Sequence, residues 1–305
     1  MLGYVLRRLA GFLPVLLVIV SLSFFMMRLA PGGPFDQERA LPEQVRANIE
    51  ARYHLNEPLW RQYARYLSEV GRGDLGPSFR YPDRSVNELL ALGFPVSLIL
   101  GLCALTVALT VGGTAGVLAG LRRNSFLDYL TMSFALGGIS VPNFVLGPVL
   151  MLMFALGLGW LPVAGWGTWK HLVLPSVTLG TFYAAYVARL TRAGMLEVIG
   201  QDFIRTARAK GLREATVVLR HALPGAILPV VTYLGPASAA VLTGSVVVET
   251  IFSIPGIGRY FVSSALNRDY TMVLGTVVFY SVLLLLFNLI VDVLYAYLDP
   301  RVQVR

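Results

Sequence analysis

Long apolar runs separated by polar segments dominate the pattern of this chain. A helix needs roughly 20 apolar residues to cross a hydrocarbon core about 30 Å thick. Six runs meet that length: Leu9–Leu29, Phe94–Leu121, Tyr129–Leu156, His171–Leu190, Ile227–Val248 and Met272–Leu298. Each run must be helical, because lipid offers no partner to backbone N–H and C=O groups. The pattern predicts an all-α polytopic membrane protein with about six transmembrane helices.

Composition and charge agree with this class and set the orientation. The chain is 56% hydrophobic and 14% charged, whereas soluble domains are about a quarter charged. Its mean hydropathy is +0.67. The net charge is +8, and many of the basic residues gather at alternate ends of the runs: Arg7, Arg8, Arg122, Arg123, Arg189, Arg192, Arg205, Arg208, Lys210, Arg213, Arg220, Arg301 and Arg305. With six spans these residues all fall on one side, which the positive-inside rule makes cytoplasmic, with both termini there. A nucleic-acid surface is not expected, since no basic module with interleaved aromatic residues occurs.

The chain divides into an N-terminal transmembrane anchor (1–30), an external segment (31–93) and a core transmembrane domain (94–305). The anchor resembles a signal peptide, but its apolar run is long for one and Pro31 would follow the cleavage point, so we expect it to be retained. In the external segment, the patterns over Pro42–Tyr53 and Glu57–Val70 predict two helices. The segment is either a small cap over the spans or a docking surface for an external partner.

Two places in the core have features of a translocation path or gate. Pro142 interrupts the third run and is followed by the polar Asn143, which fits a kinked helix beside a path and equally a plain structural kink. After the fifth run, Glu249 precedes a turn-forming stretch with Pro255, Gly256 and Gly258. This stretch predicts a short re-entrant or interfacial structure near an outer gate, with a simple connector as the alternative.

Small and polar residues inside the spans have simpler explanations. Gly112, Gly116 and Gly120 repeat every four residues, a spacing that lets helices approach closely. Asp292 lies near the cytoplasmic end of the last run, and we expect it to pair with a basic residue at that end, such as Arg189 or Arg192. No chain of buried acids is evident, so the sequence does not favour proton coupling.

The sequence contains no recognisable catalytic motif. The three histidines, His54, His171 and His221, lie in the external segment, at a span start and in a cytoplasmic segment, and no His-Glu-x-x-His motif occurs. No phosphate-binding loop occurs, since Lys170 and Lys210 follow Trp and Ala. With one cysteine there is no internal disulfide. We expect no catalytic residue, no metal site and no bound cofactor, so that any ATP is hydrolysed by another subunit.

The basic segment Arg205–Pro224, between the fourth and fifth runs, has the features of a docking site. Asp202 to Lys210 predicts about two helical turns, and Gly211 suits the left-handed conformation that ends a helix. The small Ala207 and Ala209 would let a partner come close. An interfacial helix held by anionic lipid is the alternative.

This segment resembles the EAA loop of ATP-binding-cassette importer permeases, whose pattern is Glu-Ala-Ala, three residues, Gly, nine residues, Ile, one residue, Leu-Pro. Ala207, Gly211, Leu223 and Pro224 match that pattern. Arg205, Thr206 and His221 replace its Glu, first Ala and Ile. Such departures are usual in the dipeptide, oligopeptide and nickel permeases. Further motifs resemble that branch in the same order: RRLAGFLPVLLVIVSLSFFMMRLAPGGP, GDLGPSF, ETIFSIPGIGR, NRDY and NLIVDVLYAYLDPR.

The resemblance implies the type I (MetI-like) importer permease fold in a bacterial or archaeal cytoplasmic membrane. It implies a second homologous permease subunit, two ATPase subunits that use ATP and magnesium, and an extracytoplasmic solute-binding protein. The segment 191–226 would then couple the chain to the ATPases through Arg205, Thr206, Ala207, Lys210, Gly211, His221, Leu223 and Pro224. Di- or oligopeptides are the expected cargo, with nickel chelates, glutathione or other small solutes as alternatives. A secondary, ion-coupled transporter is the rival class.

Overall fold

The computed structural model describes residues 2–29, 55–81, 83–242 and 246–298. Within these ranges the chain is helical and contains no β-strand. The helices are α1 Leu2–Leu29, α3 Leu59–Gly71, α4 Val86–Val107, the π-helical η1 Ala108–Gly112, α5 Gly113–Leu121, α6 Phe126–Ser140, α7 Asn143–Leu150, the π-helical η2 Met151–Gly157, α8 Trp169–Ile199, α9 Asp202–Ala209, α10 Glu214–Thr216, the π-helical η3 Val217–Ala222, α11 Leu223–Ala226, α12 Leu228–Leu242, α13 Val246–Ile251, α14 Ile257–Leu266 and α15 Tyr270–Leu298.

Membrane-length helices confirm the predicted class. Five are long and apolar enough to cross a bilayer: Leu6–Leu29, Val86–Leu121, Trp169–Ile199, Leu228–Ile251 and Tyr270–Val293. A sixth crossing is possible only if α6 together with α7 and η2 counts as one broken span. The prediction of about six spans therefore agrees with the described part of the chain.

The third predicted run, Tyr129–Leu156, is broken rather than gently kinked. Its two halves meet at an angle of 107°. Val141 has an extended backbone (φ −88°, ψ 115°), as does Pro142 (φ −61°, ψ 144°). The proline ring disfavours helical geometry at the preceding residue, so the helix ends there and restarts at Asn143.

The second span begins eight residues before its predicted start, inside the stretch assigned to the external segment. Ser85 forms a capping box: its hydroxyl accepts a hydrogen bond from the Glu88 backbone N–H at 3.2 Å, and the Glu88 carboxylate accepts one from the Ser85 N–H at 3.4 Å. Such a cap stabilises a helix start by satisfying backbone donors. Hydrophobicity alone marks the apolar part of this helix but not its polar first turns.

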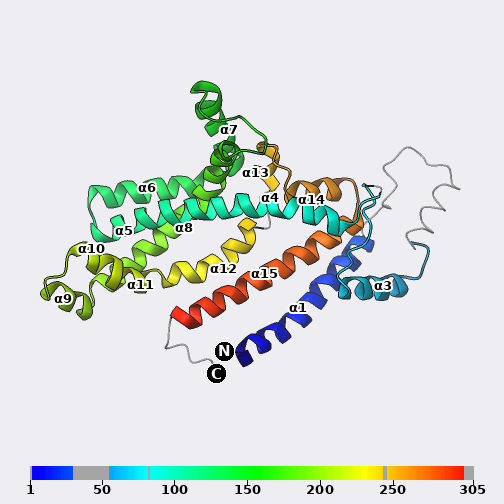
Figure 1. Cartoon of the computed structure of the whole chain (residues 1–305), viewed down its shortest axis with the longest axis horizontal. Helices are drawn as coiled ribbons and strands as arrows, with labels where there is room; N and C mark the ends of the chain where they lie inside the picture. Colours follow the sequence, from blue (N-terminus) through cyan, green and yellow to red (C-terminus); the bar gives the residue numbers. More distant parts are fainter. Residues whose placement is uncertain (1, 30–54, 82, 243–245, 299–305) are drawn as a thin grey trace.

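Helix α8 lies at the centre of the core and packs against α4, α5, α6, α7, α11 and α12 (Figure 1). The glycine stripe lies on this contact, as predicted. A Cβ added at Gly116 would lie 2.5 Å from the Ala188 carbonyl oxygen, and one at Gly120 would lie 2.6 Å from Met195 Cβ. Gly112 meets the backbone of Ala184 still more closely. The absence of side chains lets the helix backbones touch.

Helices α1 and α3 lie on the side of the molecule near α15 (Figure 1). The predicted helix Glu57–Val70 is present as α3, and its Tyr63 and Tyr66 rings lie 5.4 and 5.5 Å from that of Phe24 in α1. The other predicted external helix, Pro42–Tyr53, lies outside the described residues. Helices α9 and α10 lie at one end of the long axis, and α3 and α14 lie toward the other (Figure 1).

Candidate functional site

The segment predicted to couple to a partner forms a helical hairpin at one end of the molecule (Figure 1). Helix α9 follows α8 after a turn at Gly200, and the chain returns through α10, η3 and α11. One face of α9 is anchored, because Ile204 and Ala207 are buried in a cluster with Met195 of α8 and apolar residues of the returning helix. The other face is exposed, including Arg205, Thr206 and Lys210. The hairpin therefore presents a basic surface on a firmly packed base.

Ala207 has a different environment from the one expected. Its side chain is 5% exposed and contacts its own chain, so it does not face an approaching partner. Its small size instead lets α9 lie close to the returning helix. Ala209 is exposed, as expected.

Gly211 ends α9 as predicted. Its φ is +75°, in the left-handed region that favours glycine. Its N–H donates to the Arg208 carbonyl at 2.9 Å, and the Leu212 N–H donates to the Ala207 carbonyl at 3.4 Å. These bonds close the end of the helix.

An ion pair joins the two arms of the hairpin across this turn. Arg208 Nη2 lies 2.6 Å from Glu214 Oε1, and Arg208 Nε donates to Glu214 Oε2 at 3.2 Å. The hydrogen bonds from Arg208 hold the pKa of the Glu214 carboxyl below its ordinary value. Glu214 was not among the predicted residues, although an acidic side chain in the first turn of a helix is favoured by the helix dipole.

The segment also exposes large apolar residues that were not predicted. Phe203 in α9 is 47% exposed and Leu219 in η3 is 62% exposed. Aromatic residues exposed among charged ones are typical anchors of protein interfaces. Their presence beside Arg205 and Lys210 extends the candidate surface.

Pro224 suits a break before the fifth span, and the structure has that break three residues further on. The helix runs on to Ala226, and a turn follows at Ile227. The wider π-helical turn η3 ends at Ala222, two residues before the proline. Such a turn relieves the clash between a proline ring and the carbonyl four residues earlier. His221 and Leu223 are half-buried in this arm, and Pro224 is exposed.

The hairpin is joined rigidly to the spans. Gly194 of α8 contacts the backbone of Ala226 so closely that no Cβ would fit. This contact joins the returning arm of the hairpin to α8, and α11 leads on into α12.

The ion pairs near this end differ from the prediction for Asp292. Asp292 Oδ2 lies 3.1 Å from Arg8 Nη2, so Asp292 pairs with a basic residue as predicted, but with Arg8 rather than Arg189 or Arg192. Arg192 instead donates to both carboxylate oxygens of Asp128, at 2.6 and 2.8 Å. Helix α15 packs on α1, whereas α8 packs on α6, and this docking decides which charges meet.

The predicted outer-gate segment turns as expected between α13 and α14, and Glu249 is its buried centre. Glu249 is fully buried in the last turns of α13, and its Oε1 accepts a hydrogen bond from Ser97 Oγ of α4 at 2.7 Å. Ser97 Oγ in turn accepts one from the Ile257 N–H at 2.9 Å. A Cβ added at Gly256 would lie 2.5 Å from both Glu249 oxygens, and one at Gly258 would lie 3.0 Å from Oε2. The glycines thus let the chain wrap around the carboxylate, with Pro255 exposed at the turn.

The two candidate path segments meet through α7. Asn143 begins this helix and is half-buried, while Pro142 before it is exposed. Helix α7 packs on α13, where a Cβ at Gly147 would lie 3.3 Å from the Phe252 ring. No group of three or more His, Cys, Asp or Glu side chains in the described ranges is placed to hold a metal ion.

Known proteins resemble this chain over nearly all its length. Residues 112–304 match the sequence profile of the family described as "Binding-protein-dependent transport system inner membrane component". The chain is 52% identical to the oligopeptide transport system permease protein OppB of Haemophilus influenzae, over 99% of this chain and all of that protein. It is 47% identical to the dipeptide transport system permease protein DppB of Bacillus subtilis, over 99% of this chain and 98% of that protein.

Solved structures share the fold. An inward-facing structure of the MetNI methionine ABC transporter superposes with a TM-score of 0.59 at 19% identity, covering 69% of this chain and 96% of that one. A crystal structure of an amino acid ABC transporter with histidines superposes with a TM-score of 0.51 at 20% identity. It covers 69% of this chain and 94% of that one.

Proposed function

Since the chain belongs to the family of binding-protein-dependent transport system inner membrane components, we propose that it forms half of the translocation path of an ATP-driven peptide importer. It is a permease subunit, a transport component rather than an enzyme, and it lies in the bacterial inner membrane with several membrane-spanning helices. The fold is that of the MetI-like permeases.

The proposed partners are two ATPase subunits, a second permease subunit and an extracytoplasmic binding protein that delivers the cargo. ATP and magnesium belong to the ATPase subunits in this proposal. The observation that carries it is the basic outer face of α9, with Phe203 exposed beside it, on a base fastened by Ile204 and Ala207. Such a surface fits an acidic groove with an apolar floor.

The proposed mechanism is rigid-body transmission. When the ATPases close on ATP, they move α9, and the tight contact between Gly194 and Ala226 carries that movement into α8 and α12. Rocking of these spans opens the path alternately to the two sides, as transporters require. The residues proposed for coupling are Arg205, Thr206, Lys210, Gly211, His221, Leu223 and Pro224, and Ala207 supports them by packing inside the hairpin. The residues proposed for the path and gate are Pro142, Asn143, Glu249, Pro255, Gly256 and Gly258.

Peptide cargo is proposed from the curated relatives, which are oligopeptide and dipeptide permeases. The cargo is tested by purifying the cognate extracytoplasmic binding protein and identifying what it holds by mass spectrometry. Short peptides support the proposal, whereas a nickel chelate or a sugar contradicts it.

The coupling role is tested by co-purification with the ATPase subunits in mild detergent. Phe203→Ala should reduce ATPase retention at least several-fold, because an aromatic hot spot of an interface contributes about 2 kcal/mol or more, about 30-fold in affinity. Trp60→Ala is the matched control, since Trp60 is 65% exposed on α3 toward the other end. Equal retention by the two variants would contradict the docking surface.

A further inference from the structure

The outward-facing positions of α8 and α12 differ from those of the other long helices. On α1 the exposed side chains are aliphatic, among them Leu6, Leu13 and Leu17, as contact with lipid favours. Along α8 and α12, which the structure describes in full, Trp169 at the start of α8 is the only large apolar side chain that is exposed. The remaining open positions of these two helices therefore do not fit a surface that contacts lipid.

On α8 the open positions form a stripe that is aromatic and basic. Phe182, Tyr186, Arg189 and Ala193 follow one another at intervals of four, three and four residues, which places them on one face of the helix. Phe182 and Tyr186 are half-buried, and their ring centres lie 5.2 Å apart. Arg189 is exposed, and its guanidinium carbon lies 5.2 Å from the Tyr186 ring centre. The stripe thus carries a positive charge on the side nearer α9.

The charge of Arg189 is not neutralised by the acidic residues of neighbouring helices. Asp128 of α6 pairs with Arg192, and Asp292 of α15 pairs with Arg8. Within the described ranges Arg189 itself forms no ion pair. Its guanidinium can therefore hold an anion from outside the chain in a bidentate manner.

On α12 the open positions are small or polar. Pro229, Thr232 and Pro236 lie three and four residues apart and are exposed, and Tyr233 beside them is half-buried. Pro236 lies inside the helix and has no N–H to donate to the Thr232 carbonyl. A carbonyl deprived of its helical donor is costly against lipid but is tolerated beside a water-filled cavity. The proline therefore favours an aqueous surface at this point of α12.

A stacked pair of tyrosines joins the two stripes. The Tyr186 ring of α8 and the Tyr233 ring of α12 have centres 5.5 Å apart and planes at 19° to each other. Neither hydroxyl forms a hydrogen bond with a described residue, and neither is among the buried polar atoms that lack a partner. Both hydroxyls are therefore open to the outside of the chain, where each can donate and accept.

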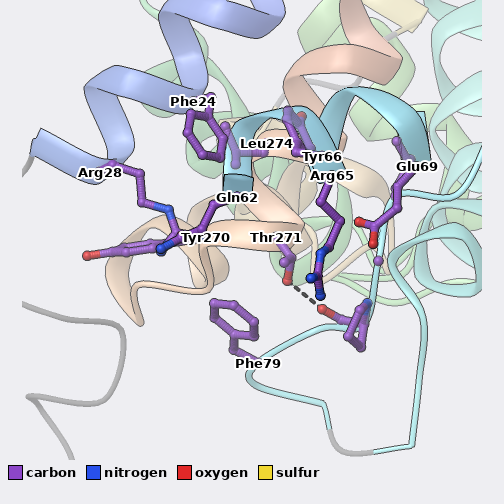
Figure 2. Close-up of a pocket in the computed structure, with 13 residues that line it drawn as sticks. Phe24, Arg28, Gln62, Arg65, Tyr66, Glu69, Phe79, Tyr270, Thr271 and Leu274 are labelled. Carbon is purple, nitrogen blue, oxygen red and sulfur yellow. Dashed lines mark hydrogen bonds between the residues drawn. The ribbon is translucent and has the colours of Figure 1, made fainter. Parts of the chain in front are cut away.

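A second arginine that lies over a tyrosine ring, Arg28, is enclosed. Figure 2 shows it next to Tyr270 in a pocket between α1, α3 and α15, which Gln62 and Tyr66 also line. Its guanidinium carbon lies 5.9 Å from the Tyr270 ring centre. The pocket has a volume of about 140 Å³, which corresponds to four or five waters at roughly 30 Å³ each. It is too small for a peptide, whereas the surface at Arg189 is open.

We propose that the surface shared by α8 and α12 lines the inner part of the translocation path and holds an extended peptide, with Arg189 receiving the peptide's C-terminal carboxylate. This surface, the tyrosine face, consists of Phe182, Tyr186, Arg189, Thr232, Tyr233 and Pro236. The inference rests on the proposed import function and adds the surface that the cargo contacts.

The dimensions and chemistry of the tyrosine face match a short peptide. Steps of 5.2 and 5.5 Å lead from the Arg189 guanidinium through the Tyr186 ring to the Tyr233 ring. An extended chain advances about 3.3–3.6 Å per residue, so a tripeptide spans about 10 Å. The two phenols can pair with its backbone N–H and C=O groups, and the rings can contact its side chains. Because these contacts use mainly the peptide backbone, they admit cargo of varied sequence.

The tyrosine face also lies on the spans that the proposed mechanism moves. The coupling hairpin follows α8 in the chain and leads through α11 into α12. Tyr186 belongs to the first of these spans and Tyr233 to the second, so a shift between the spans alters the stacked pair. The same movement that reorients the path thereby weakens its hold on the peptide.

The first test determines whether water reaches the tyrosine face in the assembled complex. Thr232→Cys is introduced into a Cys103→Ala chain, and the complex with its partner subunits is purified into phosphatidylcholine nanodiscs. We expect a membrane-impermeant methanethiosulfonate to modify this chain, followed by its mass, without nucleotide and again with ATP. Thr106→Cys is the matched control. Thr106 likewise donates to the carbonyl four residues earlier, but it lies on α4 with the exposed Ile99 and Leu102, on a face that fits lipid.

The second test determines whether a peptide covers the same position. Protection is the ratio of the modification rates of Thr232→Cys without and with trialanine. Saturating trialanine should slow the modification several-fold. Trialaninamide, which lacks the carboxylate, should need a concentration about 10- to 100-fold higher, as expected for a lost charge-assisted hydrogen bond.

Two side chains of the face are then changed in the Thr232→Cys chain. Arg189→Gln should remove the preference for the free carboxylate, and Arg189→Lys should restore most of it because lysine keeps the charge. Tyr233→Phe keeps the ring, so trialanine affinity should fall about 3- to 10-fold while the Tm of the complex does not change. Arg122→Gln is the matched control, since Arg122 is exposed at the end of α5 and should leave protection unchanged.

The proposal is overturned if Thr232→Cys is as unreactive as Thr106→Cys, which would place this surface against lipid or the second permease subunit. It is also overturned if trialanine gives no protection, or if trialanine and trialaninamide protect equally. Peptide uptake into proteoliposomes by the Cys103→Ala complex is measured separately. Uptake without protection overturns the tyrosine face alone, whereas the absence of uptake overturns the import function on which the inference rests.

Discussion

Individual glycines decide how closely the spans of this protein approach one another. Gly112, Gly116 and Gly120 lie against α8, and Gly180 of α8 lies against the Ala104 carbonyl of α4 in the same manner. In a membrane the association of helices depends on such packing, because lipid is as apolar as the side chains. A methyl group at these positions would require the helices to separate.

Gly116→Ala should therefore destabilise the purified complex by about 1–3 kcal/mol, the usual cost of overpacking. The added Cβ would lie 2.5 Å from a backbone oxygen that cannot move aside. Gly113→Ala is the matched control, since it lies on the same helix with nothing within 4 Å of its Cβ. Thermal unfolding followed by tryptophan fluorescence should show a lower Tm for the first variant only. A Tm for Gly116→Ala equal to that of Gly113→Ala would refute the close contact.

Ser97 is a second residue whose effect can be isolated. It donates to Glu249 and accepts from the Ile257 N–H, so Ser97→Ala leaves two buried groups unpaired, at about 1–3 kcal/mol each. Ser176→Ala is the control: Ser176 is 4% exposed and its Oγ has no partner among the described residues. We expect thermal stability to fall only in the Ser97 variant. Similar losses in both variants would mean that the bonds around Glu249 contribute little.

At the scale of elements, α9 is short and draws its stability from its neighbours. An isolated helix shorter than about 12 residues is marginal in water. Ile204 and Ala207 fix one face of α9, and Gly211 directs the chain back along the other arm. The hairpin can therefore move as one unit with α8.

Gly211→Val should uncouple ATP hydrolysis from uptake, because valine at φ +75° costs about 1–3 kcal/mol and favours another turn geometry. The control is Gly200→Val at the other end of α9. Neither glycine has an atom within 4 Å of its Cβ, but Gly200 has φ −78°. In proteoliposomes the Gly211 variant should retain ATPase activity while uptake falls several-fold. Unchanged uptake would count against the coupling role of the turn.

At the scale of the whole molecule, the N-terminal part of the chain lies beside a core whose fold is shared with solved relatives. The family profile begins at residue 112, and the solved relatives cover 69% of the chain. Helices α1 and α3 pack near α15, while the coupling hairpin lies at the far end of the long axis (Figure 1). The charge pattern places that hairpin in the cytoplasm.

The orientation can be tested with single cysteines in a Cys103→Ala background. Ala64→Cys on α3 and Ala215→Cys on α10 are both at exposed positions. A membrane-impermeant maleimide added to spheroplasts should label Ala64→Cys at once, and Ala215→Cys only after permeabilisation. The reverse order of labelling would place the coupling hairpin outside and exclude contact with a cytoplasmic ATPase.

The sequence by itself determined the features that depend on local properties. The apolar part of each span follows from hydrophobicity, a bend at Pro142 from the steric demand of proline, and the end of α9 from the left-handed conformation open to Gly211. Tertiary structure alone decided that Asp128 pairs with Arg192, that Asp292 pairs with Arg8, that Ala207 faces inward, and that Arg28, Gln62 and Tyr66 share one cavity. These pairings join residues far apart in the chain, and they depend on which faces of the helices pack together, which no local pattern records.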